Sequence, residues 1–201
     1  MRFYWENKSL NIANCITLSR IALSFVFLLS IMVGMRWTDI VSFYVFLIAA
    51  VSDIFDGCVA RITDSITSLG KFMDPLADKI LVSVGLISIA GRGLIDEWPV
   101  VLIIGREIFI TGIRSIAAYR GVVIQPIPIA RVKTFLQMAV VFIYLLKLSY
   151  LPIYKIFVDY MWQIFRVDGE VILYYLLVLT VVITLLTGII YVWRNKKVIV
   201  G

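Results

Sequence analysis

Four aspartates occur as two closely spaced pairs in the first half of the sequence. Asp53 and Asp56 are three residues apart, and Asp74 and Asp78 are four apart. On a helix, either spacing places both side chains of a pair on one face. Four neighbouring carboxylates repel one another unless a cation neutralises them. All-oxygen ligation suits hard divalent ions such as Mg²⁺, Mn²⁺ or Ca²⁺, so the pattern predicts a two-metal site for phosphate chemistry.

Small and basic residues surround these aspartates. Gly57, Ala60 and Gly70 leave room beside the acidic positions for a substrate or for close backbone approach, although Gly57 is alternatively a helix-packing notch. Arg61 and Lys71 are candidates for binding diphosphate oxygens, and their alternative role is to anchor the chain on the cytoplasmic side. The sequence has no histidine, so any proton transfer falls to carboxylates or lysine.

The elements that position these residues are expected to be membrane helices. The 201-residue chain is 62% hydrophobic and 16% charged, with a mean hydropathy of +1.00, far from the balance of a soluble domain. Five apolar runs reach or approach the roughly 20 residues that cross a bilayer, and charge interrupts a sixth. We therefore predict an all-α integral membrane protein that forms one domain over residues 1–201. The spans are expected at about 21–37, 39–60, 73–91, 98–119, 134–151 and 171–193.

The second and third spans are expected to form an antiparallel hairpin. The connection between them, residues 61–72, is short and polar. A short connection makes consecutive helices antiparallel neighbours, which can bring both aspartate pairs together.

Three segments lie outside the predicted bundle of residues 21–193. Residues 1–20 are expected to be an interfacial segment, with a short amphipathic helix over 8–20, and residues 194–201 to be a cytoplasmic tail. For residues 151–170, we favour an ordinary outer loop over a second interfacial helix. Aromatic and charged residues alternate there, and both structures accommodate them.

Basic residues predict the orientation of the chain. Cytoplasmic segments of membrane proteins hold an excess of Lys and Arg. One side carries most of the net charge of +6, which suits anionic head groups and phosphorylated substrates. We expect a multi-pass protein of the cell membrane whose termini and active site are cytoplasmic. Nucleic acid binding is not expected, since no soluble basic module is present. The basic residues of this side are Arg2, Lys8, Arg20, Arg61, Lys71, Arg120, Arg131, Lys133, Arg194, Lys196 and Lys197.

Eight residues carry a resemblance to the CDP-alcohol phosphatidyltransferase family. They match its signature in identity and spacing: Asp53, Asp56, Gly57, Ala60, Arg61, Gly70, Asp74 and Asp78. The resemblance implies six membrane helices, a homodimer, two divalent cations (Mg²⁺ or Mn²⁺) and displacement of CMP from a CDP-linked lipid by an alcohol. It also implies that Asp53, Asp56 and Asp74 are mainly metal ligands, whereas Asp78 is both a ligand and the base for the acceptor hydroxyl.

Outside the signature, the chain resembles the phosphatidylglycerophosphate synthase branch of that family. The branch uses CDP-diacylglycerol and sn-glycerol 3-phosphate, which we expect as partners together with membrane lipids. Two positions depart from the branch pattern: Ala13 replaces a frequent proline, and Ala130-Arg131 replaces Gly-Lys. The matching pieces are Asn11-Ile12-Ala13-Asn14 with Thr17 and Arg20, Arg106-Glu107-Ile108 with Arg114, and Lys133-Thr134 with Gln137.

A phosphorylated acceptor needs a cationic pocket of its own, which buried arginines can supply. The alternatives are an Arg106–Glu107 pair that only fixes helix packing and a Lys133 that only extends to head groups. Asn14 and Thr17 are predicted to bind the CDP-lipid, or else to cap their segment. The residues assigned to the acceptor phosphate are Arg106, Arg114, Arg131 and Lys133.

Two other functions remain open from the sequence. The same chemistry could use serine, inositol phosphate or a lipid alcohol as acceptor, and a cationic second pocket argues against serine. A cation transporter with an acidic site is the alternative of another class. It would place charge near the bilayer midplane and repeat its broken helices, whereas these aspartates lie near predicted helix ends and no repeat is visible.

Overall fold

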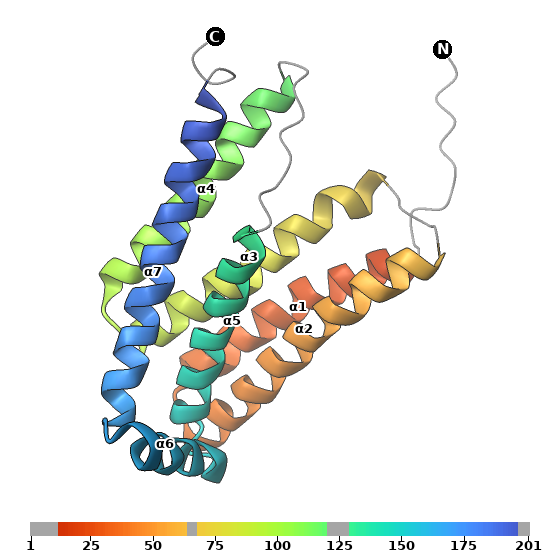
Figure 1. Ribbon diagram of the computed structural model, residues 1–201. Coiled ribbons are helices and arrows are strands. Elements are labelled where there is room, and N and C mark those ends of the chain that lie inside the picture. Colours follow the sequence, from red (N-terminus) through yellow and green to blue (C-terminus); the bar gives the residue numbers. More distant parts are fainter. Residues whose placement is uncertain (1–11, 64–67, 120–128, 197–201) are drawn as a thin grey trace, which may run out of the picture. The chain divides into compact units, whose positions relative to one another are not determined.

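The computed structural model describes residues 12–63, 68–119 and 129–196. Side chains are described for residues 17–52, 76, 77, 79–119, 132–164 and 166–196. Within these ranges the chain is helical and has no strand (Figure 1). The helices are α1 (Ile12–Val33), α2 (Arg36–Thr63), α3 (Ser68–Gly91), α4 (Glu97–Tyr119), α5 (Ile129–Leu148), α6 (Pro152–Phe165) and α7 (Gly169–Arg194).

Each predicted span overlaps one of these helices; α1 begins nine residues before the first predicted span, and the other ends differ by at most five residues. The high mean hydropathy and α7 together indicate a membrane protein. Among the described residues, α7 is the helix whose length and apolarity suffice to cross a bilayer. The bent pair Val132–Leu148 and Pro152–Ile164 would be a second if the two formed one span. The prediction of six spans therefore stays a prediction.

The helices form two compact units. Unit 1 comprises Met1–Ser88 with Tyr144–Leu151, and unit 2 comprises Ile89–Ile143 with Pro152–Gly201. Unit 1 therefore contains α1, α2 and most of α3, whereas α4, α6, α7 and most of α5 belong to unit 2.

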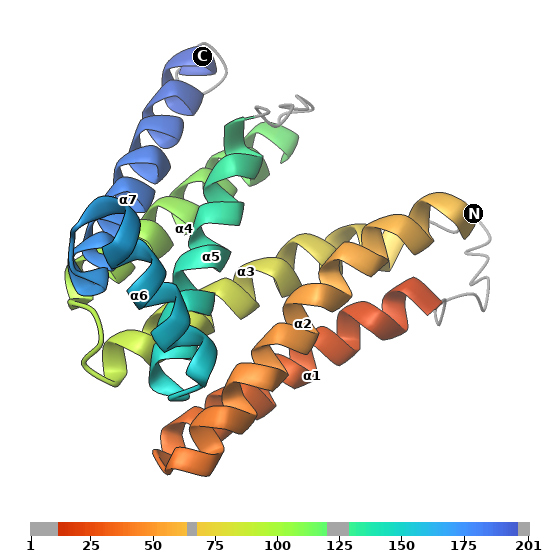
Figure 2. The same cartoon turned by 60° about the horizontal axis from the view of Figure 1, so that its bottom comes forward.

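Helices α1 and α2 of unit 1 pack side by side as a hairpin (Figure 2). The turn between them uses Gly34, whose φ of 73° lies in the left-handed region that favours glycine. Between the helices, the hydroxyls of Ser30 and Ser42 are 2.8 Å apart, and the rings of Phe27 and Phe46 have centroids 5.6 Å apart. Apolar packing and the contact between these hydroxyls thus help to hold this hairpin together.

The predicted boundary between an interfacial helix and a first span, at residue 20, falls inside one continuous helix. Helix α1 continues from Ile12 to Val33, and residues 1–11 lie outside the described part. Thr17 and Arg20 are buried on α1, whereas Leu18 is exposed. A helix among membrane helices turns its polar residues toward the protein and its apolar residues toward lipid. Thr17 and Arg20 therefore line the inside of unit 1.

The favoured outer loop over residues 151–170 is wrong, because the structure places α6 there. Pro152 begins the helix, where its missing N–H costs nothing. Arg166, with a φ of 54°, follows its end, and Asp168 caps α7 by accepting a hydrogen bond from the backbone N–H of Glu170 at 3.1 Å. The axes of Val132–Leu148 and Pro152–Ile164 differ by 113°. Helix α6 therefore does not continue the direction of α5.

Candidate functional site

The two aspartate pairs lie on consecutive helices of unit 1. Asp53 and Asp56 belong to α2, and Asp74 and Asp78 belong to α3, so each pair keeps its helical spacing. The two helices run in opposite directions (Figure 1), as predicted, and their connection, residues 64–67, lies outside the described residues. The other signature positions and Lys71 are also helical: Gly57, Ala60 and Arg61 in α2, and Gly70 and Lys71 in α3.

The side chains of these residues lie outside the described part of the structure, so the metal site stays a prediction. Its donor set fits hard cations, because the acidic positions on α2 and α3 offer oxygen alone. Among the side chains that the structure does describe, no group of three acidic or cysteine residues is arranged to hold a metal ion. The four aspartates therefore remain the candidate ligands.

A second polar site lies in unit 2 around the Glu107 carboxylate. One of its oxygens, Oε1, accepts hydrogen bonds from Arg106 Nη1 at 2.9 Å and from Lys133 Nζ. The exposed fractions of the side chains are 17% for Glu107, 9% for Arg106 and 7% for Lys133. The Arg106–Glu107 pair, which the sequence left as the alternative to phosphate binding, is present and includes Lys133 as a third member.

Helix α7 supplies further partners to the arginines of α4. Arg106 Nη2 donates to Thr187 Oγ1 at 3.2 Å. Arg114 Nε donates to the Tyr191 hydroxyl at 3.2 Å, and the Arg114 guanidinium lies over the Tyr191 ring, 5.3 Å from its centroid. Aromatic faces attract cations, so α7 holds both guanidinium groups in fixed positions.

We call Arg106, Glu107, Arg114 and Lys133 the basic cluster. Arg106 and Lys133 both contact the single carboxylate of Glu107, and Arg114 lies further along α4 against Tyr191, so these four side chains carry a surplus of two positive charges. Buried charge of one sign is costly unless an opposite charge balances it. The cluster is therefore suited to binding a dianion such as a phosphate monoester.

Of the four residues predicted to bind the acceptor phosphate, Arg106 and Lys133 share the Glu107 carboxylate, and Arg114 lies about two turns along α4 against Tyr191. The fourth, Arg131, lies in α5 two residues before Lys133, and its side chain is outside the described residues. Of the two residues predicted to bind the CDP-lipid from α1, Thr17 is buried in unit 1, and the side chain of Asn14 is not among those described.

Sequence reasoning missed the contribution of α7, which we had predicted to be only an apolar span. Gln137 Nε2 on α5 donates to Thr184 Oγ1 at 3.2 Å, one turn before Thr187. The signal was present in the spacing of the polar and small residues, which recur on one helix face. They are Thr180, Thr184, Thr187, Gly188 and Tyr191, and all are buried.

The lack of a side chain at Gly188 lets Arg106 lie against α7. A Cβ at this position would lie 3.0 Å from Arg106 Nε and 3.1 Å from its Cγ, closer than an ordinary contact. Any larger residue would therefore displace the guanidinium that contacts Glu107 and Thr187.

A groove of about 680 Å³ runs between α4 and α7 beside Arg106. Apart from Arg106 and Lys196, which lies at one end, its walls are apolar. Such a lining suits hydrocarbon and excludes a small anionic acceptor. The remaining lining residues are Val101, Leu102, Gly105, Phe109, Ile110, Leu185, Gly188, Ile189, Val192 and Trp193.

Comparison with known proteins yields a family and several relatives. The CDP-alcohol phosphatidyltransferase family model matches residues 10–193. The chain is 32% identical over 187 residues to the CDP-diacylglycerol--glycerol-3-phosphate 3-phosphatidyltransferase of Rickettsia felis, covering 93% of this chain and 96% of that protein. Proteins of the same name from Rickettsia bellii and Bacillus subtilis are each 36% identical. The match to the Rickettsia bellii protein spans 128 residues, which is 64% of this chain and 71% of that protein. The match to the Bacillus subtilis protein spans 143 residues, which is 65% of this chain and 74% of that protein.

Proposed function

The chain belongs to the CDP-alcohol phosphatidyltransferase family, and from this we propose that it transfers the phosphatidyl group of CDP-diacylglycerol to sn-glycerol 3-phosphate. The products are phosphatidylglycerophosphate and CMP, which places the reaction in phospholipid biosynthesis. The observation that carries the proposal is the family match over residues 10–193, which includes all eight signature positions. The assignment of the acceptor rests on the activity for which the relatives are named and on the surplus charge of the basic cluster.

The residues around the aspartates hold the CDP-linked lipid. Arg61 and Lys71 donate to diphosphate oxygens as charge-assisted partners. The small signature residues, Gly57, Ala60 and Gly70, leave space for the nucleotide, and Asn14 and Thr17 add polar contacts from α1. The acyl chains stay in the hydrocarbon of the bilayer, while the diphosphate faces the aqueous acceptor.

Two divalent cations, Mg²⁺ or Mn²⁺, complete the site, with Asp53, Asp56, Asp74 and Asp78 as ligands. When bound, they neutralise the phosphate oxygens and the charge that develops on the leaving group. The reaction is then a single displacement at phosphorus. Asp78 accepts the proton of the acceptor hydroxyl, whose oxygen forms a bond to the β-phosphorus. The bond between that phosphorus and the bridging oxygen breaks, and CMP leaves with the electron pair.

The basic cluster positions the acceptor by its phosphate group. Arg106 and Lys133 hold their charges in largely buried, hydrogen-bonded positions, Arg114 is partly buried against Tyr191, and Arg131 adds a fourth charge from the start of α5. Fixed donors lower the entropic cost of orienting a substrate. In this proposal, Glu107 sets the direction of Arg106 and Lys133 and takes no part in proton transfer.

We further propose a homodimer in the cell membrane with six spans, and with both termini and the site on the cytoplasmic side. The orientation follows from the distribution of basic residues, which includes Arg194 and Lys196 at the end of α7.

The proposal is tested by an acceptor panel. Purified enzyme in mixed micelles would receive CDP-diacylglycerol with glycerol 3-phosphate, serine, inositol phosphate or phosphatidylglycerol, and the lipid product would be identified by mass spectrometry. We expect phosphatidylglycerophosphate from glycerol 3-phosphate and no product from the others. Activity confined to another acceptor would refute the assignment of the acceptor. Divalent-dependent ion uptake without CMP release would indicate the transporter instead.

A further inference from the structure

Helix α6 carries an apolar stripe that no described part of unit 2 covers. The four residues follow one another at intervals of three, four and four, which places them on one helix face. Their exposed fractions run from 51% to 66%, so the stripe faces outward. They are Ile153, Ile156, Tyr160 and Ile164.

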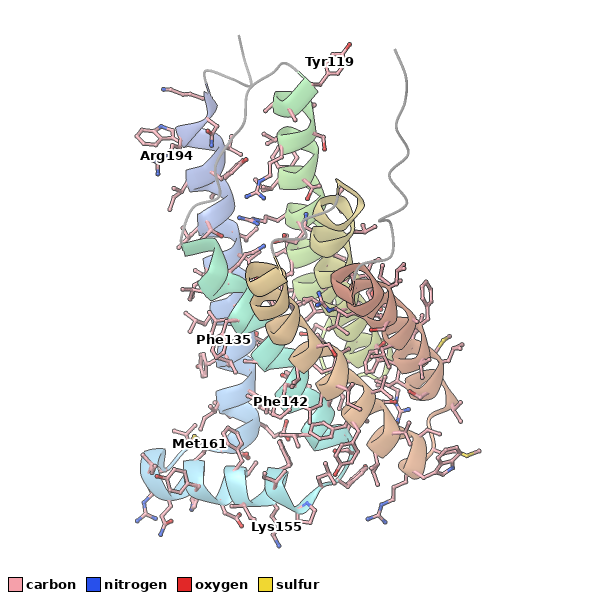
Figure 3. All side chains as sticks on the ribbon, turned by 90° about the vertical axis from the view of Figure 1, so that its right-hand side faces the viewer. Tyr119, Phe135, Phe142, Lys155, Met161 and Arg194 are labelled. Atoms are coloured by element: carbon pink, nitrogen blue, oxygen red, sulfur yellow. The ribbon has the colours of Figure 1, made fainter. Side chains whose placement is uncertain are left out.

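The other faces of α6 have different partners. Val158 packs against α7 so closely that a Cβ at Gly169 would lie 2.8 Å from its Cγ2, and the Tyr154 hydroxyl donates to Glu170 Oε1 at 3.2 Å. Figure 3 shows Met161 on the side of α6 that faces α7 and Lys155 pointing away from that helix. The helix therefore has a packed face, a charged face and the apolar stripe.

The start of α7 sets the depth of α6 in the membrane. Helix α7 has the length and apolarity of a bilayer span, and the exposed polar residues Asp168 and Glu170 mark its first turn. Only residues 166–168 separate the two helices. Because so short a connection cannot carry α6 far from this end, the helix lies at the level where hydrocarbon meets head groups.

We propose that α6 is an interfacial helix whose stripe of Ile153, Ile156, Tyr160 and Ile164 inserts into the acyl boundary of the bilayer. Amphipathic helices of this kind bury their apolar face about 5–10 Å into the head-group region and leave their charged face in water. The inserted stripe anchors the N-terminal end of α7, at Gly169, in the bilayer. It also fixes the depth of unit 2 in the bilayer, a role separate from the phosphatidyl transfer.

The charges of α6 indicate the kind of lipid surface that it fits. Lys155 and Asp159 are its charged residues, so the helix has no net charge. Head-group charge therefore contributes little, and apolar insertion drives the contact. We expect the same depth in vesicles of phosphatidylcholine alone and in vesicles with a large fraction of anionic lipid.

The inference is tested with spin labels at two adjacent positions of the full-length protein in vesicles. Ile156→Cys places a label on the stripe, and Lys155→Cys places the matched control label about 100° away around the helix. Cys15 and Cys58 would first be replaced by serine, and CMP release would confirm that each labelled protein is folded. Collision rates with oxygen, which concentrates in hydrocarbon, and with a water-soluble nickel chelate on both sides of the vesicle report the depth.

For the stripe, we expect the ratio of oxygen to nickel collisions to exceed that of the control by at least about tenfold. A nickel-accessible label at position 156 would refute the inference, because the stripe would then lie in water. Inaccessibility to both reagents, with dipolar broadening between labels, would also refute it and would identify a second copy as the occupant. An equal depth in neutral and anionic vesicles supports the proposal, whereas a depth that requires anionic lipid contradicts it.

Discussion

Gly188→Ala tests whether the position of Arg106 matters for the acceptor. The new Cβ would lie 3.0 Å from Arg106 Nε, where ordinary contact begins at 3.4 Å, so the side chain must move by about 0.4 Å. It cannot move freely, because its two Nη atoms are bonded to Glu107 at 2.9 Å and to Thr187 at 3.2 Å. Weakening one charge-assisted hydrogen bond costs about 1.5 kcal/mol, which corresponds to roughly a tenfold loss of affinity.

The assay is the initial rate of CMP release at varied glycerol 3-phosphate and saturating CDP-diacylglycerol. We expect Gly188→Ala to raise the KM for glycerol 3-phosphate about tenfold and to change that for CDP-diacylglycerol by less than about twofold. Gly112→Ala is the matched control, since it makes the same change in helix propensity with no atom within 4 Å of the new Cβ. An unchanged KM in the Gly188 variant, or an equal rise in the Gly112 variant, would refute the reasoning.

Three further substitutions test separate parts of the account. Asp78→Asn removes the proposed base, so kcat should fall by about 10²–10⁴ in the same assay, and a near-normal kcat would reject that role. Glu107→Gln leaves the buried cations Arg106 and Lys133 without their carboxylate and should lower the free energy of unfolding by about 3 kcal/mol. The same change at the exposed Glu97 should lower it little, and equal losses in thermal unfolding would contradict the burial argument. Gly169→Ala places a Cβ 2.8 Å from Val158 Cγ2 and should lower the free energy of unfolding by about 1–3 kcal/mol. Adding Val158→Ala removes the clash and should restore the stability. A loss that persists in the double variant would indicate another cause.

The sequence predicted the six long helices because long apolar runs separated by charged residues have few other structures available to them. It failed where polar residues were mixed with apolar ones. Residues 8–20 were predicted to form an interfacial helix because polar and apolar residues are mixed there, and Thr17 and Arg20 face the inside of unit 1. In α6, Ile153, Ile156 and Tyr160 recur at helical intervals, but charged residues interrupt the apolar ones and a loop was favoured.

For the candidate site, too, the sequence predicted some residues and missed others. The spacing of the aspartates indicates their chemistry, because few structural roles require two pairs of carboxylates on adjacent membrane helices. Residues of α4 and α5 were predicted to bind phosphate; Arg106 and Lys133 share the Glu107 carboxylate, and their binding of phosphate stays a prediction. Their partners on α7 were missed because a threonine fits an apolar span whether or not its hydroxyl bonds another helix. Such long-range partners depend on tertiary packing, which local patterns do not specify.

The measurement that tests the central claim most directly is CMP release from CDP-diacylglycerol by the purified protein, with and without glycerol 3-phosphate. It would be made with Mg²⁺ or Mn²⁺ and again after chelation. We expect release only when acceptor and cation are both present, with one phosphatidylglycerophosphate formed for each CMP. Release that ignores glycerol 3-phosphate would contradict the proposed acceptor. Full activity after complete removal of divalent ions would contradict the proposed role of the four aspartates.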